Sequence, residues 1–357
     1  MKEKLIFLGI ETSCAETAAA IVRGKNDGTG EILSNIVSSQ VEEHKEFGGI
    51  VPELAARAHV EKIEFIVQKA IKKSNVDINN LDGVAATAGP GLIVSLTVGL
   101  NIGKAIAGSL EKPFVAVNHL EGHALSPTIN KKIEFPYLLL LISGGHTQFL
   151  EVNGGNKYQR LGTTIDDALG EAFDKTAKLL GLEFPGGPKL EEWAKKGDEN
   201  FFKLPKPILK KGGCNLSFAG LKTAVLRISK EIKKEKEKYH LAASFQKTVN
   251  EILHTKTIVA MDNFLKNKKN KTNTFVIAGG VASNLSIRQN LIKLSKEKNF
   301  IPVFPPVNLC SDNAAMIAWA GIERYKNNLI DNLEFPSKAR WPLDSSAPFL
   351  KGPGLKF

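Results

Sequence analysis

The sequence predicts an α/β fold built from two related halves. Short apolar runs alternate with longer stretches of helical spacing, a pattern typical of α/β architecture. The 357 residues exceed a typical single core, and the 43% apolar content is spread evenly along them. Two similar apolar segments, residues 5–13 and 138–145, each end in small polar residues and precede a second strand. Each half is therefore expected to open with a β-hairpin.

Apolar runs and apolar spacing locate the individual elements in chain order. Strands are expected over 4–10, 17–23, 31–37, 83–88, 113–117, 137–143, 146–152, 273–278 and 301–304. Helices are expected over 52–73, 94–109, 166–181, 218–232, 240–266, 284–297 and 312–326. In the longest helix, Leu241, Phe245 and Val249 recur on one side, which favours an amphipathic helix with a buried face.

The composition indicates the cellular compartment in which the protein works and the kind of partner it binds. The first apolar run, residues 5–10, is too short for a membrane span and has no cleavage site, so we expect a core strand in a cytoplasmic protein without a membrane partner. The three cysteines are far apart and odd in number, which does not suggest a disulfide framework. The net charge of +11 favours a polyanionic partner, although the lysine-rich runs 230–238 and 266–271 also fit solvated surfaces.

His119 and His123 form the sharpest local signal. Residues at i and i+4 of a helix project from one face, one turn apart, so the two imidazoles can share a metal ion. The alternative is a chance pair, one capping a helix and one packed. Glu121 is expected roughly 160–200° around the helix from both histidines, facing away from a shared metal. That position disfavours a zinc peptidase of the H-E-x-x-H type.

A third metal ligand is expected in the segment 309–316. Asp312 would complete a set of two imidazoles and one carboxylate, which suits Fe(II), Zn or Mn. The alternative is that Ser311 or Asp312 only caps the helix that follows. The residue types do not choose among the three metals.

Glycine-rich segments mark candidate ligand turns. Residues 143–147 follow one predicted strand, residues 278–284 join another strand to a helix, and residues 185–188 read Pro-Gly-Gly-Pro. Glycine lets backbone amides approach phosphate or carboxylate oxygens closely, and a helix start adds positive partial charge. Ordinary tight turns are the alternative. Neither a Walker sequence nor a G-x-G-x-x-G stands where it would be needed, so P-loop and Rossmann folds are excluded.

These motifs together resemble the family of tRNA N6-adenosine threonylcarbamoyltransferases of bacterial type, formerly called O-sialoglycoprotein endopeptidases or glycoproteases. One departure is Ala15, where the family usually has an aspartate after the cysteine. The likeness covers nearly the whole chain, in the segments Gly9–Cys14, His44–His59, Gly89–Gly91, His119–His123, Ser143–Gln148, Asp166–Lys175, Pro185–Pro188, Ser217–Lys222, Gly279–Asn284 and Cys310–Ala315.

The resemblance implies a fold, a reaction and a set of residues. The fold is the duplicated actin-like one, with a first domain of 1–115 plus 305–357 and a second domain of 116–304. In the reaction, threonylcarbamoyl-AMP donates its acyl group to the N6 amine of adenosine 37, just 3′ of the anticodon, in tRNAs reading codons that begin with adenine. The product is t6A, and AMP is released.

Several site residues follow from the same resemblance. It implies one divalent metal ion per subunit, Fe²⁺ first and Zn²⁺ as the alternative, bound by His119, His123 and Asp312. A separate hypothesis gives Glu11 the task of helping to remove the proton from the amine. The adenylate would be held by Leu141, Ile142, Ser143, Gly144, Gly145, Asp174, Gly187 and Asn284.

Three other classes of protein compete with this interpretation. A small-molecule kinase or ATPase of the same fold would have no use for the histidine pair. A metallopeptidase would ignore adenylates, and a catalytically silent paralogue would lack the metal residues. For the transferase, the expected partners are tRNA, threonylcarbamoyl-AMP, an inactive paralogue and a P-loop ATPase.

Overall fold

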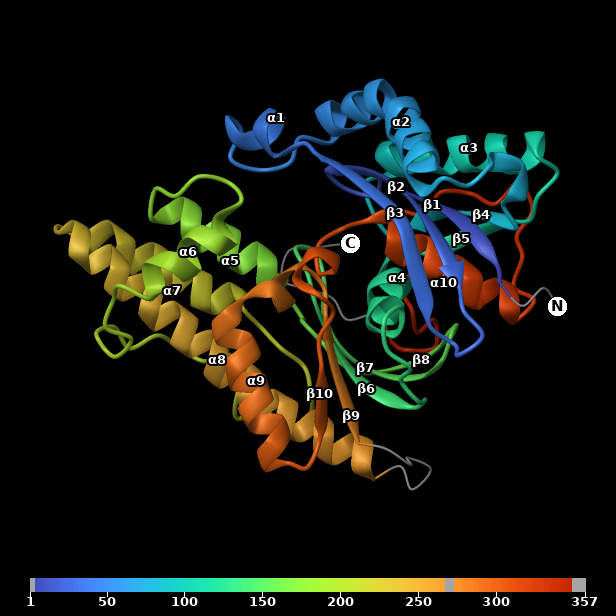
Figure 1. The fold of residues 1–357 in the computed structure, drawn as a ribbon. Coiled ribbons are helices and arrows are strands. Elements are labelled where there is room, and N and C mark those ends of the chain that lie inside the picture. Colours follow the sequence, from blue (N-terminus) through green and yellow to red (C-terminus); the bar gives the residue numbers. More distant parts are fainter. Residues whose placement is uncertain (1–3, 267–272, 349–357) are drawn as a thin grey trace. The chain divides into compact units, whose positions relative to one another are not determined.

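The computed structural model describes residues 4–266 and 273–348, which form two compact units (Figure 1). Unit 1 comprises the described residues up to Glu134, with Gly154–Lys157 and Pro305–Ser345. Unit 2 comprises Phe135–Asn153, Tyr158–Phe304 and the described residues from Ser346 onward. Beyond Lys266, the second lysine-rich run lies outside the described residues.

Unit 1 contains a five-stranded sheet in the order β3-β2-β1-β4-β5. The first three strands form an antiparallel meander, whereas β4 and β5 run parallel to β1. Its strands are β1 Ile6–Glu11, β2 Glu16–Gly24, β3 Gly30–Ser39, β4 Gly83–Gly89 and β5 Phe114–Asn118. Its helices are α1 Val41–Lys45, α2 Pro52–Ser74, α3 Ile93–Ser109, α4 His119–Leu125 and α10 Ala314–Lys326.

Unit 2 repeats this topology with the order β8-β7-β6-β9-β10. Again the first two strands of the unit form an antiparallel hairpin and the last two run parallel to the first, so the predicted opening hairpins are confirmed. The strands are β6 Tyr137–Ile142, β7 Thr147–Gly154, β8 Lys157–Thr163, β9 Thr274–Ala278 and β10 Ile301–Val303. The helices are α5 Leu169–Leu179, α6 Gly186–Ala194, α7 Ala219–Glu231, α8 Glu235–Leu265 and α9 Leu285–Glu297.

The sheet of unit 1 is covered on both faces, because its strands are apolar on both sides. Along β1, Phe7 belongs to the cluster that includes α10, whereas Leu8 belongs to the cluster that includes α2. Gly9 permits the close approach of α10, since a Cβ on Gly9 would lie 2.5 Å from the backbone nitrogen of Ala318. This packing fixes α10, and with it the turn that precedes its first residue.

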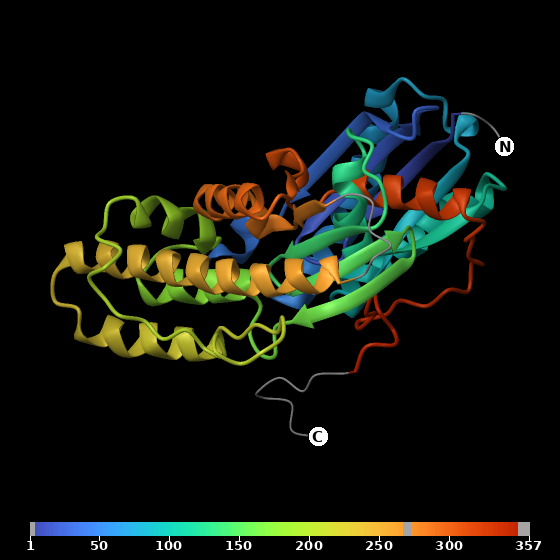
Figure 2. The ribbon, with the colours of Figure 1, turned by 90° about the horizontal axis from the view of Figure 1, so that it is seen from below.

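Unit 2 is built around α8, which Figure 2 shows running beside the shorter α7. The side of α8 that carries Leu241, Phe245 and Val249 is fully buried, as the apolar spacing predicted. A charged side chain, that of Lys256, also lies on the buried side. The Lys256 Nζ donates to the carbonyl oxygens of Lys211 and Gly213, and burial lowers its pKa.

The predicted elements match the structure closely, with three omissions. The strand β8 and the helices α1 and α6 were not predicted, and the Pro-Gly-Gly-Pro segment is the start of α6, where Pro185 precedes the first turn. The domain boundaries also differ from those predicted. Residues 116–134 belong to unit 1, because β5 pairs with β4, and unit 1 ends at Ser345. Within the described residues, no helix is long and apolar enough to cross a membrane.

Candidate metal centre and ligand turns

In unit 1 the residues of interest lie at the carboxyl ends of parallel strands. Glu11 ends β1, Gly89 ends β4 and Asn118 ends β5. Since β1, β4 and β5 are parallel neighbours, these three ends meet at one edge of the sheet. Local sequence placed each residue at the end of a strand, and the strand pairing brings the three ends together.

The two histidines lie on a helix, as predicted. Asn118 caps α4, with its Oδ1 accepting the backbone N–H of Leu120 at 2.9 Å. His119 and His123 are both buried, and their ring centroids lie 4.7 Å apart in an edge-to-face arrangement. The i, i+4 spacing therefore places the two imidazoles together in the interior of unit 1.

Asp312 lies against both imidazoles. Its Oδ1 is 3.0 Å from Nε2 of His123 and 3.5 Å from Nε2 of His119. The N-cap of α10 is Asn313, whose Oδ1 accepts the backbone N–H of Met316 at 3.1 Å. The capping alternative for Ser311 or Asp312 is therefore wrong, and the predicted proximity of Asp312 to the histidines is confirmed.

This donor set fits a divalent metal ion. Ligand atoms bound at about 2.0–2.2 Å to one ion lie roughly 2.8–3.6 Å apart at octahedral or tetrahedral angles, which matches both Nε2 to Oδ1 distances. All three donor atoms lie within 4.8 Å of one another. Two imidazole nitrogens and one carboxylate oxygen leave further coordination positions open, as a catalytic site requires.

Glu11 contacts the imidazole of His119 at Nδ1, the ring nitrogen that does not face Asp312. Its Oε2 lies 3.0 Å from Nδ1 of His119 and accepts the hydroxyl of Thr87 at 2.6 Å, and its Oε1 accepts the backbone N–H of Ser13 at 2.5 Å. A carboxylate can only accept, so the His119 Nδ1 donates to Glu11, and Nε2, on the Asp312 side, is left to bind a proton or a metal ion. A buried carboxylate behind a ligating histidine is the usual arrangement at metal sites.

The charges around His119 favour a cation at this position. Burial alone would lower the pKa of His119, but the carboxylates of Asp312 and Glu11 outweigh it and raise the pKa to about 9. Burial likewise opposes ionisation of Glu11, yet the neighbouring His119 lowers the pKa of that carboxyl overall. Two carboxylates thus face the imidazole from both of its nitrogen atoms, and a proton or a metal ion balances them.

Glu121 faces away from this centre, as predicted. Its Oε2 accepts the Nη1 of Arg324 at 3.1 Å, and both side chains are largely buried. This ion pair ties α4 to α10 and leaves no carboxylate of α4 directed at the imidazoles. The zinc-peptidase arrangement is therefore not present in α4.

Sequence reasoning passed over one titratable neighbour, Glu16. Burial and the negative charges of Asp312 and Glu11 together raise the pKa of Glu16 to about 8. Glu16 opens β2, so the β1–β2 hairpin brings it near the end of β1. The signal that could have found it is its position in the segment that follows the predicted first strand.

In unit 2 the predicted ligand residues surround the ends of β6 and β9. The turn after β6 presents Gly144 and Gly145 to open space, since an added Cβ would meet nothing within 4 Å at either position. Below it, the amides of Gly170 and Glu171 at the start of α5 donate to the carbonyl oxygens of Ser143 and Gly144. These two hydrogen bonds hold the turn against the start of α5, and its backbone amides can approach an anionic ligand.

Asp174, Gly187 and Asn284 lie in the same unit but have internal contacts of their own. The Asp174 carboxyl accepts the amides of Gly186 at 2.9 Å and Gly187 at 3.3 Å, and burial raises its pKa. Asn284 caps α9 through the amide of Ile287, and its Nδ2 donates to Gln246 at 2.9 Å. Asp174 and Asn284 therefore fix the first turns of α6 and α9, respectively. Leu141 and Ile142 are fully buried strand residues, so they form the base of the turn and do not reach its surface.

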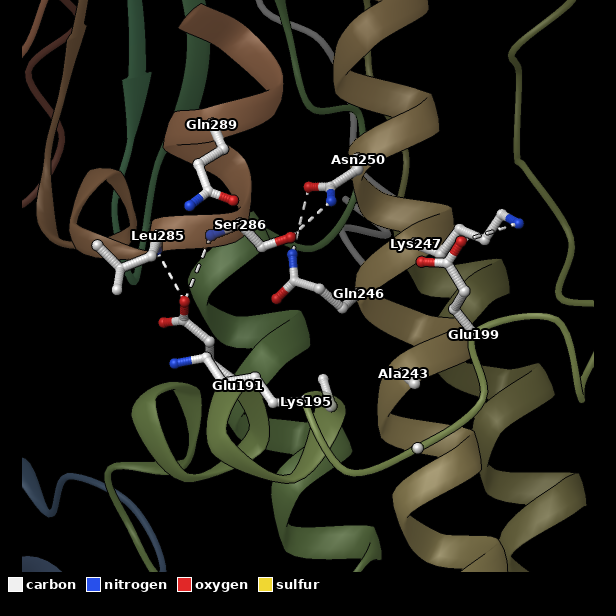
Figure 3. Close-up of a pocket in the computed structure, with 12 residues that line it drawn as sticks. Glu191, Lys195, Glu199, Ala243, Gln246, Lys247, Asn250, Leu285, Ser286 and Gln289 are labelled. Atoms are coloured by element: carbon white, nitrogen blue, oxygen red, sulfur yellow. Dashed lines mark hydrogen bonds and ion pairs between the residues drawn. The ribbon is translucent and has the colours of Figure 1, made fainter. Parts of the chain in front are cut away.

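A pocket of about 450 Å³ lies between α6, α8 and α9 (Figure 3). Glu191 reaches across it, with Oε1 accepting the amides of Leu285 at 2.8 Å and Ser286 at 3.4 Å. The Asn250 Nδ2 donates to the Ser286 hydroxyl at 2.8 Å. None of the eight predicted adenylate residues lines it, but Gln246 joins it to Asn284, and its volume suits a small organic ligand.

Known proteins resemble this chain in sequence and in fold. A family model described as tRNA N6-adenosine threonylcarbamoyltransferase matches residues 31–319. The protein of that name from Pelagibacter ubique (strain HTCC1062) is 64% identical over 356 residues, which is 100% of both chains. Its counterpart from Chelativorans sp. (strain BNC1) is 51% identical over 354 residues, covering 98% of each chain.

Solved structures share the architecture at low sequence identity. HypF of T. kodakarensis matches with a TM-score of 0.61 and 16% identity, over 92% of this chain and 48% of that one. Component A of the (R)-2-hydroxyglutaryl-CoA dehydratase of Acidaminococcus fermentans matches with a TM-score of 0.50 and 16% identity, over 90% and 98% of the chains. These likenesses concern the fold alone, and they confirm the predicted duplicated actin-like ATPase-type fold.

Proposed function

Since the chain belongs to the tRNA N6-adenosine threonylcarbamoyltransferase family, and is thus a transferase that modifies tRNA, we propose the full reaction as follows. Threonylcarbamoyl-AMP is the donor, and the N6 amine of adenosine 37 is the acceptor. The amine nitrogen attacks the carbamoyl carbonyl carbon, the bond from that carbon to the phosphate oxygen breaks, and AMP leaves with the electron pair. The amine loses one proton, and t6A is formed.

The observation that carries this proposal is the convergence of His119, His123 and Asp312 in unit 1. These three side chains would hold one divalent metal ion, Fe²⁺ first and Zn²⁺ as the alternative, since the donor set suits either. Such an ion would polarise the acyl donor and offset negative charge on its oxygens. Glu11 would keep the His119 ring in the orientation that presents Nε2 to the ion.

Unit 2 would bind the nucleotide part of the donor. Gly144 and Gly145 are exposed and an added Cβ would meet nothing within 4 Å at either, which leaves room for the AMP phosphate at this turn. The pocket beside Asn284 has room for the adenosine part, and its Glu191 and Gln246 offer polar partners. Ser143 and Gly187 would contribute through the backbone, and Asp174 by holding the start of α6. Leu141 and Ile142, which are fully buried, would contribute by forming the strand that precedes the turn.

Proton removal from the amine needs an acceptor with spare hydrogen-bonding capacity. Both oxygens of Glu11 already accept buried donors, so Glu11 is proposed to act as a positioning residue for His119. Glu16 is the second acid to test for proton exchange, because it opens β2 and the β1–β2 hairpin brings it near the end of β1. Replacing each of the two acids separates these roles.

An inactive paralogue and a P-loop ATPase are proposed as partner proteins on the basis of family membership. Unit 1 offers a surface for such a contact, an apolar groove of about 580 Å³ between α2 and α3. Val60 and Val94 line it and are 63% and 59% exposed. Val60→Asp should weaken co-purification with the paralogue and leave metal content unchanged.

The deciding experiment couples metal analysis to acyl transfer. Purified protein, with its partners added, is supplied with threonylcarbamoyl-AMP and unmodified tRNA, and t6A and bound metal are both measured. His119→Ala and His123→Ala should lose both, whereas Glu121→Gln, a buried carboxylate on the same helix, should keep both. Full transfer by a metal-depleted protein, or phosphorylation or peptide cleavage instead of t6A formation, would overturn the proposal.

A further inference from the structure

The segment that follows α10 runs from the start of β5 to the site edge of the sheet in unit 1. We call residues 331–341 the strap. Its start is fixed at β5, where the amide of Asp331 donates to the carbonyl oxygen of Phe114 at 3.0 Å. Its centre is fixed at β4, where the amide of Lys338 donates to Ala88 at 2.7 Å. The fit at this point is close, since a Cβ on Gly89 would lie 2.0 Å from the carbonyl oxygen of Lys338.

The end of the strap lies directly beside the metal ligands. The carbonyl oxygen of Trp341 accepts the Nδ2 of Asn118 at 2.9 Å, and Asn118 is the cap residue immediately before His119. The carbonyl oxygen of Ala339 accepts the amide of Gly91 at 3.3 Å. The next amide, that of Leu92, donates to Ser13, whose hydroxyl lies 3.1 Å from Nδ1 of His119. Two short chains of contacts thus connect the strap to the same imidazole.

The strap carries a preorganised group of cations and aromatic rings. The Lys338 ammonium lies 4.7 Å from the ring centroid of Phe335 and 4.9 Å from that of Trp341. Arg340 is exposed. Among residues 4–266 and 273–348, neither Lys338 nor Arg340 has a carboxylate oxygen within 4.0 Å, so neither cation is held in an ion pair. We call these four residues, Phe335, Lys338, Arg340 and Trp341, the cationic cluster.

The lysine-rich segment at 230–238 differs from the cationic cluster in its setting and in having no aromatic residue; acids occur in both segments, as Asp331 and Glu334 in the strap. There the lysines alternate with Glu231, Glu235 and Glu237, and the segment joins α7 to α8 in unit 2. Lys233 and Lys236 are exposed there without an aromatic neighbour holding them. Such a mixed run is typical of a solvated surface. The two exposed lysines therefore provide a charge-matched control.

We propose that the cationic cluster binds the sugar–phosphate backbone of the single-stranded anticodon loop of the acceptor tRNA, next to the metal centre. The inference rests on the proposed function, because the acceptor amine must reach the donor at this centre. Single-stranded RNA loops are bound by cations that contact phosphates and by aromatic or guanidinium planes that meet unstacked bases. The cluster offers both kinds of group within seven residues, on a strap that is fixed to the end of β5.

The test measures RNA binding and acyl transfer in parallel. The probe is a fluorescently labelled anticodon stem-loop with an unmodified adenosine 3′ of the anticodon, titrated with the intact protein at several salt concentrations. A lost phosphate contact removes a salt exponent of about 0.7, which corresponds to about five-fold in affinity at 0.1 M salt. Arg340→Ala should weaken binding about five-fold, and Lys338→Met with Arg340→Ala about 25-fold.

Controls separate a binding role from a structural one. Arg340→Lys keeps the charge and should restore most of the affinity. The cluster variants should raise the KM for tRNA, while the KM for threonylcarbamoyl-AMP, the metal content and the thermal midpoint of Arg340→Ala stay at wild-type values. The pair Lys233→Ala and Lys236→Ala should change affinity less than two-fold.

Two results would overturn the proposal. One is affinity within two-fold of wild type for the doubly substituted cluster, and the other is an equal loss in the lysine control pair. A wild-type protein that binds the stem-loop but forms no t6A would instead refute the proposed function, and the binding comparison would still decide the role of the strap.

Discussion

Replacing Glu11 with glutamine tests whether this carboxylate positions His119 or accepts the proton of the amine. Three donors converge on its two oxygens, from Ser13, Thr87 and His119. A glutamine has only one acceptor oxygen, so its amide group must face at least one of these donors. Leaving one buried donor unsatisfied costs about 1–3 kcal/mol of the free energy of unfolding.

The same change should weaken metal binding. Loss of a carboxylate that orients a ligating histidine lowers metal affinity about 10- to 100-fold, which is roughly 1.4–2.7 kcal/mol. The measurement is a competition titration of Zn²⁺ against a fluorescent chelator at fixed pH. Acyl transfer is then assayed at saturating metal, where the positioning role predicts recovery of most of the rate.

Glu121→Gln is the matched control, because Glu121 is also a buried carboxylate but pairs with Arg324 on the other side of α4. It should lower stability and leave the metal affinity unchanged. Glu11→Gln with wild-type metal affinity and no transfer at saturating metal would refute the positioning role and restore the hypothesis that Glu11 is the proton acceptor.

Three further predictions concern the same two units. In chelator, the raised pKa of His119, from 6.5 to about 9, means that protonation stabilises the metal-depleted protein. This contribution, roughly 3 kcal/mol, is complete below pH 6.5 and is lost as the pH rises through 9. Urea unfolding should therefore show a decline in stability with pH that is smaller in His119→Gln, where the raised pKa of Glu16 still contributes. Asp312→Asn should reduce bound metal at least 10-fold by elemental analysis and abolish transfer, and retention of both would remove Asp312 from the ligand set. Gly279→Ala should destabilise the protein by roughly 2 kcal/mol or more, because Gly279 has a φ of 95° and an added Cβ would lie 2.4 Å from the carbonyl oxygen of Ile142. Gly280→Ala is the control: its added Cβ would meet nothing within 4 Å, so the thermal midpoint should shift much less.

The strands and most helices could be predicted because their signals are local. The buried strands β1 and β6 are continuous apolar runs, and the spacing of Leu241 and Phe245 follows the turn of a helix. The elements that were missed have weaker local signals. α6 begins with two glycines and a proline, α1 has five residues, and β8 is only partly buried.

The residues of the candidate site also fall into those that local sequence predicts and those that only tertiary packing brings together. The position of His123 relative to His119, and of Glu121 on the opposite side, follows from the helix repeat alone, so the sequence by itself determined them. The meeting with Asp312, 189 residues from His123, depends on α10 packing against the sheet through Gly9. The contact of Glu11 with His119, and the path of the strap beside them, depend on which strands pair. Such pairings are decided by burial over the whole unit, because many segments are apolar enough to form a strand and only tertiary packing selects its neighbours.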